Sequence, residues 1–293
     1  MEHFSYVRAS SVHEAVALLN EAGYSSRPLA GGTDLILISR LENICDRVVD
    51  ISLIPEMHQI VRQGDRVVIG AGAHFSEVIE SPVIQETAPL LALACRQVGA
   101  VQVRNMGTIG GNVANAAACA DTLPALVCLD AVARVVSDAG ETDWPVSELV
   151  TGPNRTRIPR GGLISSLSYV IPAAGSRGAF IKLGRRNAMA ISRLTVAALG
   201  RLDDQGRITE ARLAPGSATP HIQRFIQTEA SLIGKLPSRE LCAEAGRTAV
   251  AEMTGVTGVR WSSEYKEPAL RALVTRALLT VFGLEIEPRE GIS

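Results

Sequence analysis

Two stretches of this sequence combine adjacent glycines with a following polar side chain, and they lack the charges of an ordinary surface loop. One reads LAGGTD at residues 29–34, and the other reads GTIGGN at residues 107–112. Adjacent glycines allow positive φ and let the backbone approach a ligand with no Cβ in between. Consecutive backbone N–H groups in such a turn form a concave site for phosphate oxygens. Together the two stretches predict a binding site for a phosphate-bearing cofactor.

The energetics favour two such turns over one. Thr33 and Asn112 each follow a glycine pair and can donate one more hydrogen bond, whereas Asp34 is expected to cap the helix that follows. Nanomolar affinity corresponds to about 12 kcal/mol, and a hydrogen bond to a charged group contributes roughly 1.5–3 kcal/mol. One turn therefore falls short once the costs of association are subtracted. Either turn alone also fits a structural loop with close backbone contacts, so the interpretation rests on the pair.

A third glycine-containing segment, RVVIGAGAHF at residues 66–75, has the start of a dinucleotide-binding fingerprint. A strand is expected to run into Gly70 and Gly72, but Phe75 stands where the third glycine would fall. A G-x-G without that third glycine is weak evidence for a nucleotide. We therefore expect a tight turn after a strand here, not a Rossmann site.

The composition excludes several classes of protein. The chain has 293 residues, 46% of them hydrophobic, and a formal net charge of −1, with Lys and Arg spread along its length. This length predicts two or three subdomains, and the charge argues against a nucleic-acid or anionic-membrane surface. No apolar run approaches the roughly 18 residues of a membrane helix, and the N-terminus lacks a secretory signal. We therefore expect a cytoplasmic protein without a membrane span.

Neither the cysteines nor the histidines are spaced as metal ligands. No two cysteines form a C-x-x-C pair, and none of the five histidines is paired at helical spacing. Such cysteines are expected to act as small buried hydrophobic residues. The sequence thus predicts no metal or iron–sulfur site in this chain. The cysteines are Cys45, Cys95, Cys119, Cys128 and Cys242.

The elements around the first glycine pair predict a compact α/β unit. Ser11 and Glu14 form a capping-box pattern before a helix that Gly23 is placed to end. Residues 27–42 read as a strand, the glycine pair and a helix, and residues 47–52 read as a β-branched strand.

A second unit begins near Gln59. Helical periodicity over residues 75–99 is broken at Pro82 and Pro89. The other elements expected in this unit are strands over residues 65–72, 133–137 and 162–172 and a helix over residues 122–131, with Pro124 in its first turn.

From about Gly175 the pattern changes to a meander of antiparallel strands, with a boundary near residues 172–178. Asp203–Gly206 is the expected hairpin turn. The strands of the meander are expected within residues 178–186 and 194–216, and helices are expected over residues 224–235, 238–253 and 262–283.

The order of these motifs resembles that of a known family. LAGGTDL is followed by VVDIS, VIGAGAHFSEV, QVRNMGTIGGNVANAAACADTLPAL, FIKLGRR and WSSEYKEPALRALVTRAL. From about Phe4 to Leu284, the chain resembles the FAD-binding (medium) subunit of the molybdenum hydroxylases. That group includes bacterial xanthine dehydrogenase, nicotinate dehydrogenase and aerobic carbon monoxide dehydrogenase.

The resemblance implies an α+β fold. It consists of two α/β FAD-binding subdomains of the vanillyl-alcohol-oxidase (PCMH) type and a smaller C-terminal α+β domain with a three-stranded antiparallel sheet and a helical end. The FAD-binding domain is expected over residues 1–174, with subdomains of about 1–57 and 58–174. The C-terminal domain, of the carbon monoxide dehydrogenase flavoprotein type, is expected over residues 175–293.

The resemblance also implies which residues bind FAD. Asp121 matches an acidic residue that contacts the flavin, although it equally fits an N-cap for the helix over residues 122–131. Lys182 matches a basic residue near the isoalloxazine, although a solvated strand charge is the alternative. Leu163 and Ile164 match a backbone or aliphatic contact to the flavin. The two pyrophosphate loops correspond to Leu29, Ala30, Gly31, Gly32, Thr33, Asp34 and Leu35, and to Thr108, Ile109, Gly110, Gly111 and Asn112.

The stretch after the Arg pair and the cysteine spacing each differ from those of some relatives. Many relatives carry an Asp after the Arg pair, where this chain reads RRNAMAIS at residues 185–192, so the polar environment at the flavin edge is expected to differ. The cysteine spacing shows no sign of the additional iron–sulfur loop of the 4-hydroxybenzoyl-CoA reductases.

The implied function is that of an FAD-carrying electron-transfer subunit with no acid–base catalytic residue of its own. The molybdenum cofactor would lie in a large molybdopterin-binding partner and the [2Fe–2S] clusters in a small partner. NAD⁺ is the expected acceptor, in a xanthine dehydrogenase-like enzyme that oxidises a purine or another N-heteroaromatic. The alternatives are a carbon monoxide dehydrogenase-type subunit that reduces quinone, a stand-alone FAD oxidoreductase of the same fold, and a non-enzymatic assembly subunit.

Overall fold

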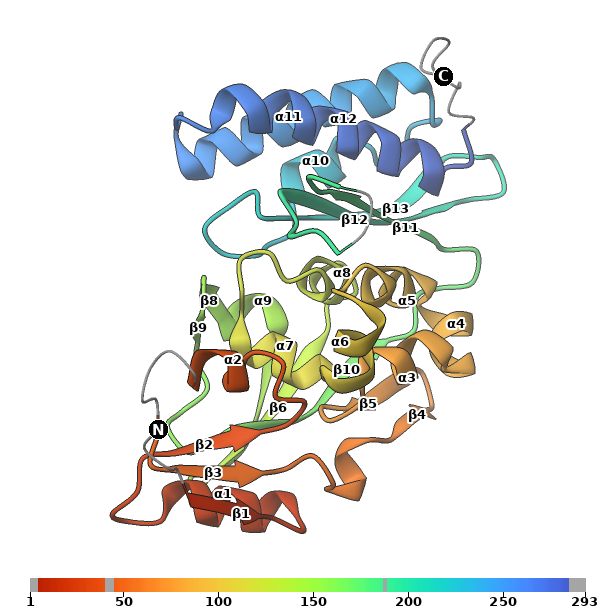
Figure 1. Ribbon diagram of the computed structural model, residues 1–293. Coiled ribbons are helices and arrows are strands. Elements are labelled where there is room, and N and C mark those ends of the chain that lie inside the picture. Colours follow the sequence, from red (N-terminus) through yellow and green to blue (C-terminus); the bar gives the residue numbers. More distant parts are fainter. Residues whose placement is uncertain (1–4, 40–44, 187–188, 285–293) are drawn as a thin grey trace.

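The chain folds into layers of sheet and helix that are stacked on one another. The computed structural model describes residues 5–39, 45–186 and 189–284. A small parallel sheet is followed by a five-stranded antiparallel sheet, a layer of helices, a three-stranded antiparallel sheet and a final helical layer (Figure 1). This arrangement confirms the predicted α+β architecture of two α/β subdomains and a smaller C-terminal part with a helical end.

The first sheet has the strand order β1-β3-β2, and both of its pairs are parallel. Helix α1 begins after Ser11, whose hydroxyl accepts the Glu14 N–H at 3.2 Å. The Glu14 carboxylate accepts the N–H of Ser10 at 2.7 Å, one residue earlier than in the predicted capping box. The elements are β1 (Ser5–Arg8), α1 (Val12–Asn20), β2 (Ser26–Leu29), α2 (Leu35–Ser39) and β3 (Arg47–Asp50).

The second sheet has the order β4-β5-β10-β6-β7 and is antiparallel throughout. Because both described neighbours of β5 are antiparallel to it, the segment at residues 66–75 is not a Rossmann unit, as expected. A Cβ at Gly70 would overlap the Met57 carbonyl oxygen, so this glycine is required by a close backbone approach. The strands are β4 (Ile60–Gln63), β5 (Arg66–Gly70), β6 (Val132–Ser137), β7 (Gly140–Pro145) and β10 (Leu163–Val170).

The helical layer reflects the proline positions in the sequence. Helices α4 and α5 begin at Pro82 and Pro89, where breaks were expected, because proline suits the first turn of a helix. The helices are α3 (Phe75–Glu80), α4 (Pro82–Thr87), α5 (Pro89–Arg96), α6 (Val101–Met106), α7 (Ile109–Asn115) and α8 (Thr122–Cys128). Shorter elements are η1 (Pro55–Met57), α9 (Val146–Leu149), β8 (Val150–Gly152) and β9 (Arg155–Thr156).

The C-terminal part begins after the connection at residues 171–176. Its sheet is the predicted meander of β11, β12 and β13, and the Gly206 N–H closes the hairpin turn on the Asp203 carbonyl at 2.9 Å. Helices α11 and α12 cover one face of this sheet (Figure 1). The elements are β11 (Arg177–Leu183), β12 (Leu194–Leu202), β13 (Ile208–Gly216), α10 (Ile226–Ala230), α11 (Arg239–Thr257) and α12 (Ser263–Val281).

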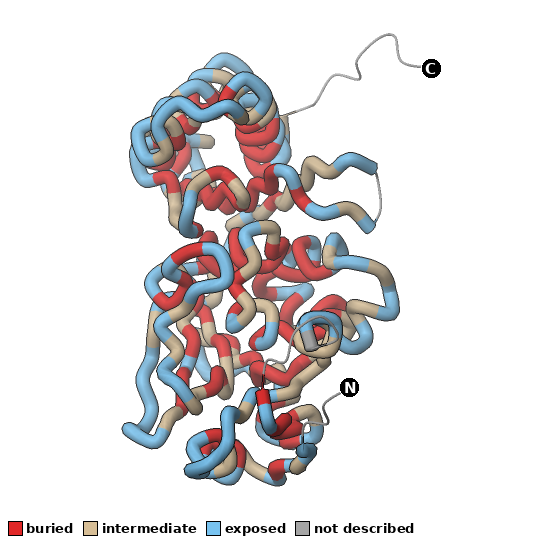
Figure 2. The backbone as a smooth tube through the Cα atoms, turned by 60° about the vertical axis from the view of Figure 1, so that its left-hand side comes forward, coloured by how far each residue is buried: buried red, intermediate tan, exposed pale blue. Residues whose placement is uncertain are grey.

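Both faces of β12 are buried, which joins the two parts of the molecule. Leu194, Val196 and Ala198 pack into the core beneath the C-terminal helices, whereas Ala197 and Leu199 pack into the core of the N-terminal part. This follows from the period of two in a strand, which sends alternate side chains to opposite faces. Figure 2 shows buried segments in both parts and where they meet.

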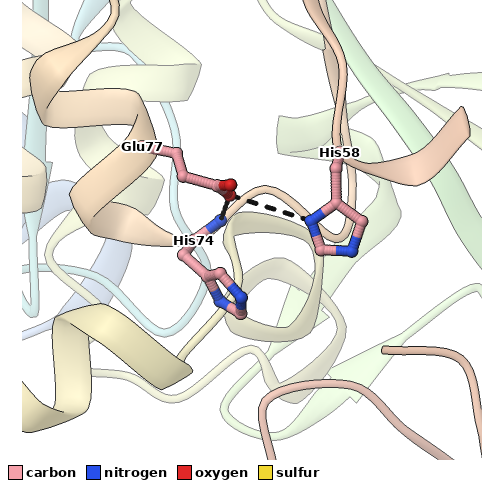
Figure 3. A group of neighbouring side chains, drawn as sticks. All are labelled: His58, His74 and Glu77. Atoms are coloured by element: carbon pink, nitrogen blue, oxygen red, sulfur yellow. Dashed lines mark hydrogen bonds and ion pairs between the residues drawn. The ribbon is translucent and has the colours of Figure 1, made fainter. Parts of the chain in front are cut away.

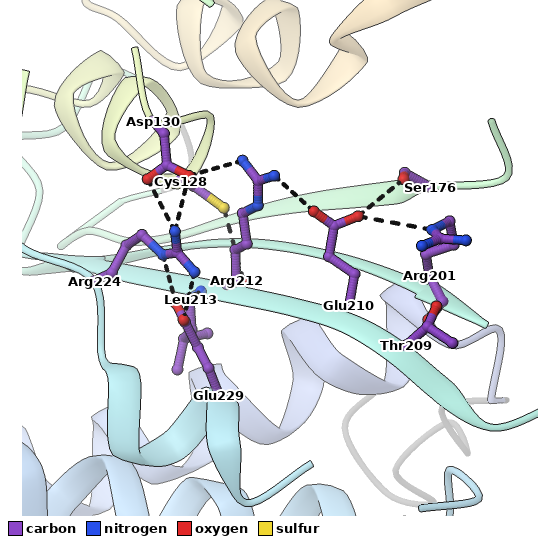
Figure 4. Close-up of polar contacts among 10 residues, drawn as sticks. All are labelled: Cys128, Asp130, Ser176, Arg201, Thr209, Glu210, Arg212, Leu213, Arg224 and Glu229. Atoms are coloured by element: carbon purple, nitrogen blue, oxygen red, sulfur yellow. Dashed lines mark hydrogen bonds and ion pairs between the residues drawn. The ribbon is translucent and has the colours of Figure 1, made fainter. Parts of the chain in front are cut away.

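A charge network also crosses between the two parts (Figure 4). Asp130, which follows α8, pairs with Arg212 at 3.0 Å and with Arg224 at 2.8 Å. Arg224 also binds Glu229 through two hydrogen bonds of 2.9 and 2.6 Å. The buried Glu229 carboxylate accepts the N–H of Leu213 at 2.7 Å. The sheet is therefore fixed to the N-terminal part by polar as well as apolar contacts.

Some expectations fall outside the described residues. They are residues 40–42 of the expected helix over 35–42, residues 187–188 of the RRNAMAIS stretch, and the end of the resemblance at Phe4. Within the described part of the chain, no helix is long and apolar enough to cross a membrane.

Candidate functional site

The two glycine stretches line one cavity of about 480 Å³. We call residues 29–35 the first glycine segment and residues 107–112 the second glycine segment. Leu163 and Ile164 of β10 contribute to the wall between them. The volume lies within the roughly 300–1,000 Å³ of small-molecule sites. From the first glycine segment, Ala30, Gly31, Gly32, Thr33, Asp34 and Leu35 line the cavity; from the second, Gly107, Thr108, Gly110, Gly111 and Asn112 do.

The first glycine segment is the predicted turn. It follows β2 and leads into α2, and Gly32 has a φ of +70°. Gly31 lies against the segment that leads into α7: a Cβ there would overlap the Met106 carbonyl oxygen and lie 2.9 Å from the Cα of Gly107. The two glycine segments therefore meet backbone to backbone, and glycine at position 31 permits that contact.

A run of backbone N–H groups in the first glycine segment lacks acceptors in the described part of the chain. These are the N–H groups of Gly31, Gly32, Thr33 and Asp34, all of which belong to cavity-lining residues. Backbone donors without a partner are rare in folded proteins unless water or a ligand satisfies them. A row of four such donors is suited to the oxygens of a phosphate or diphosphate.

The second glycine segment differs from the expectation. Gly110 and Gly111 lie in the first turn of α7, neither has positive φ, and Thr108 caps the helix by accepting the Gly111 N–H at 3.1 Å. The N–H groups of Ile109 and Gly110 bind the carbonyls of Ala73 and Ala71. The predicted second nest of free N–H groups is therefore wrong, because the loop before α3 already satisfies these donors.

What the second glycine segment offers is close packing and polar side chains. A Cβ at Gly110 would overlap the Cβ of Ala71, so α7 could not approach the loop before α3 with a larger residue. The Asn112 Oδ1 accepts the Thr122 hydroxyl at 2.5 Å, which leaves the Asn112 amide N–H₂ to donate, as expected. Among the described residues, none donates a hydrogen bond to the Asp34 carboxylate, so the predicted cap of α2 is not formed there.

Asp121 and Lys182 lie together but outside the cavity lining. Their side chains form an ion pair of 2.7 Å and are only 7% and 9% exposed. Ser192 donates to the other Asp121 oxygen, and Lys182 also donates to the Gln97 carbonyl at 2.8 Å. The two simpler interpretations are therefore wrong: the Asp121 side chain does not cap α8, and Lys182 is not solvated.

Burial disfavours the charged form of the Asp121 carboxyl. Desolvation raises the pKa of Asp121 above its ordinary value, and the hydrogen bonds from Lys182 and Ser192 together with the Lys182 charge oppose that rise only in part. Because Lys182 is on β11 and Asp121 immediately precedes α8, the pair connects the C-terminal sheet to the helical layer.

The residues that line the cavity differ in part from those predicted from the sequence. Leu29 and Ile109 do not line the cavity, and Ile109 is fully buried in the core instead. Sequence reasoning missed Arg27 and Asn154, which do line it. The positive φ of Asn154, +56°, fits the turn-forming GPNR stretch in which it lies, and that stretch was the available signal.

Comparison with known proteins gives a consistent result. Residues 2–173 match the family described as "FAD binding domain in molybdopterin dehydrogenase", and residues 179–281 match the "CO dehydrogenase flavoprotein C-terminal domain".

Individual relatives cover most of the chain. It is 31% identical to a 6-hydroxypseudooxynicotine dehydrogenase complex subunit alpha from Paenarthrobacter nicotinovorans, over 94% of this chain and 93% of the relative. It is 33% identical to a putative xanthine dehydrogenase FAD-binding subunit from Escherichia coli K12, over 74% of each. A carbon monoxide dehydrogenase structure from Hydrogenophaga pseudoflava superposes with a TM-score of 0.89 at 29% identity, over 96% of this chain and 98% of that one. The chain therefore belongs to the family of FAD-binding medium subunits of the molybdenum hydroxylases.

Proposed function

We propose that this chain binds FAD in the cavity between the two glycine segments and passes electrons from a partner subunit to a soluble acceptor. The observation that carries the proposal is the row of four N–H groups, from Gly31 to Asp34, for which the described residues supply no acceptor, on a cavity closed by the second glycine segment. FAD, when bound, supplies a carrier that exchanges electrons singly or in pairs.

The chain's own residues bind and orient that group. The first glycine segment would hold the diphosphate through its N–H groups, and Thr108 and Asn112 would add side-chain hydrogen bonds. Ile164 would contact the flavin from β10. Asp121 and Lys182 would act on it as a fixed charge pair from the boundary with the C-terminal part. Leu29 and Ile109, which do not line the cavity, would stabilise the two glycine segments by packing.

The cavity favours electron transfer over direct substrate oxidation. A stand-alone oxidoreductase that abstracts a proton from its substrate is expected to place an acid–base pair beside the flavin. Among the described residues that line the cavity, the ionisable side chains are Arg27 and Asp34, and no histidine, tyrosine, cysteine or lysine is present. We therefore assign no catalytic residue to this chain.

The partners we propose are a large molybdopterin-binding subunit and a small [2Fe–2S] subunit. The names of relatives support a complex, since one is a "dehydrogenase complex subunit" and others are "medium" chains. We favour NAD⁺ as the acceptor and a purine or other N-heteroaromatic as the substrate, supported by 33% identity to the putative xanthine dehydrogenase subunit. A carbon monoxide dehydrogenase-type subunit that reduces quinone is the second candidate, supported by the likeness to that enzyme over 96% of the chain.

We further propose a boundary between domains at residues 174 and 175, with FAD-binding subdomains of about 1–57 and 58–174, and a cytoplasmic location. The boundary is supported by the two family matches, which end at residue 173 and begin at residue 179. It lies in the connection between β10 and β11.

Isolation of the complex from its native host tests this function. A tagged form of the chain is expected to copurify with two further polypeptides, one carrying molybdenum and one carrying iron. After reduction by dithionite, the flavin should be reoxidised rapidly by NAD⁺ and slowly by a soluble quinone. Faster reoxidation by quinone would favour the carbon monoxide dehydrogenase-type alternative. A chain that copurifies with neither polypeptide would contradict the role of a subunit.

A further inference from the structure

Three potential metal ligands from two separate segments, the end of η1 and the start of α3, meet beside the cavity. His58 follows η1, His74 precedes α3, and Glu77 lies in the first turn of α3 (Figure 3). One ligand atom from each lies within 4.8 Å of the other two. His58 Nδ1 is 3.7 Å from Glu77 Oε2, and the two imidazole centroids are 5.6 Å apart.

Backbone carbonyls determine which nitrogen of each neutral ring carries the proton. His58 Nε2 is 2.9 Å from the Ser52 carbonyl oxygen, and His74 Nδ1 is 3.0 Å from the Met106 carbonyl oxygen. A carbonyl oxygen only accepts hydrogen bonds, so these two nitrogens carry the N–H. The lone pairs are then on His58 Nδ1 and His74 Nε2. This is the usual arrangement of metal-binding histidines, in which the second nitrogen donates to a carbonyl or carboxylate.

We propose that His58, His74 and Glu77 bind a divalent transition metal ion, with Zn²⁺ the best match. Two imidazoles favour zinc or a similar metal over calcium or magnesium, which prefer oxygen ligands. Two histidines and a glutamate with water in the fourth position form a known tetrahedral zinc ligand set. The sequence predicted no metal in this chain, because His58 and His74 are on separate elements and show no helical spacing.

The geometry requires a modest adjustment. Tetrahedral ligands about 2.0–2.1 Å from zinc lie about 3.3 Å from one another, so a separation as wide as 4.8 Å would have to close by about 1.5 Å. Glu77 can supply much of that movement, because its side chain is 45% exposed. Its Oε2 accepts the N–H of His74 at 2.6 Å, and the second carboxylate oxygen accepts no hydrogen bond in the described part of the chain.

The position of the site connects three segments of the cavity wall. Met57, next to His58, lines the cavity, and His74 pairs with Thr108 in an isolated β-bridge. The carbonyl oxygen of Met106 accepts the hydrogen bond from His74 Nδ1, and Gly31 packs against the same oxygen. A metal ion here would therefore link the end of η1 to the start of α3, where His74 also pairs with the second glycine segment, and would stabilise the folded chain by mass action.

Without a metal, the same residues have a simpler role. Glu77 would cap α3 through the His74 N–H and lie 3.7 Å from His58 Nδ1 as a surface contact. The two accounts differ in whether the folded chain takes up Zn²⁺ stoichiometrically, so metal binding distinguishes them.

Isothermal titration of the full-length, tag-free, EDTA-treated chain with Zn²⁺ provides the test. One equivalent should bind and should raise the thermal unfolding temperature. His58→Gln and His74→Gln keep a side-chain donor for the backbone carbonyl but remove the imidazole ligand. Each should weaken zinc binding by at least about 100-fold, since even changes to groups that only hydrogen-bond to a metal ligand cost roughly 10–100-fold. Glu77→Gln keeps an acceptor for the His74 N–H and should also weaken binding.

Two matched controls exclude other ligands. His13→Gln removes an exposed histidine of α1, and Cys119→Ser removes a partly exposed thiol; both should bind zinc like the wild type. Circular dichroism and bound flavin report whether each variant is folded. If the wild type takes up no zinc, or if the two histidine variants bind it as tightly as the wild type, the site is not a metal site.

Discussion

A Gly31→Ala variant is expected to bind FAD about 10- to 100-fold more weakly than the wild type. The added Cβ would overlap the Met106 carbonyl oxygen and lie 2.9 Å from the Gly107 Cα. Both obstacles are backbone atoms, so no side-chain rotation relieves the contact. Overpacking of this kind costs typically 1–3 kcal/mol, and each 1.4 kcal/mol corresponds to a factor of ten in affinity. The two glycine segments must separate, which displaces the N–H groups proposed to bind diphosphate.

Titration of the flavin-free variant with FAD measures this effect. Gly255→Ala is the matched control, because a Cβ at Gly255 of α11 meets no atom within 4 Å and alanine suits a helix. The control should bind FAD like the wild type. Unchanged FAD affinity in a folded Gly31→Ala chain would mean that the contact between the two glycine segments does not form the binding site.

Lys182→Met is expected to lower the free energy of unfolding by about 3–5 kcal/mol, the range for removing one partner of a buried ion pair. The change leaves the Asp121 carboxylate buried without its 2.7 Å partner and deprives the Gln97 carbonyl of a donor. Chemical denaturation measures the loss. The double variant Lys182→Met/Asp121→Asn should be more stable than Lys182→Met alone, because it carries no uncompensated buried charge.

The pH dependence of Lys182→Met follows from the same carboxyl. Burial raises the folded-state pKa of Asp121 above its ordinary value of 3.8, and removing the Lys182 ammonium removes a group that lowers it. Between the pKa of Asp121 in the unfolded state and its higher pKa in the folded state, the folded chain keeps a proton that the unfolded chain has lost. Stability therefore falls as pH rises between these two pKa values. The difference in the free energy of unfolding between the wild type and the variant should be smallest below pH 3.8 and should increase above it.

An exposed ion pair serves as the control for Lys182→Met. Arg134 and Asp143 form a contact of 2.9 Å with side chains that are 50% and 52% exposed. Arg134→Met should cost no more than about 1 kcal/mol. A Lys182→Met variant no less stable than this control would show that the Asp121–Lys182 pair does not stabilise the junction between the two parts.

Local sequence signals predicted much of the fold. The breaks at Pro82 and Pro89 and the turn at Asp203–Gly206 depend on a few adjacent residues, and the structure has all three. Strand β7 was missed because its sequence, GETDWP, is mostly polar and exposed at the sheet edge. Helix α6 was missed because its six residues are too few to show periodicity and none of them is fully buried.

The candidate site was predictable only in part, for a physical reason. That both glycine pairs would line one cavity followed from their composition, but the conformation of the second pair did not. Gly110 and Gly111 are helical because the carbonyl of Ala71 and the hydroxyl of Thr108 take up their N–H groups. Such contacts depend on tertiary packing. The same holds for His58 and His74, which only the packing of η1 against the loop before α3 brings together.

Calorimetric titration of the flavin-free chain with FAD and with FMN tests the central claim most directly. If the row of N–H groups from Gly31 to Asp34 holds a diphosphate, FAD should bind tightly and FMN, which has a single phosphate and no adenosine, should bind far more weakly. Equal affinity for the two flavins would contradict a diphosphate site between the glycine segments, and a folded chain that binds neither would contradict the assignment of this cavity to FAD.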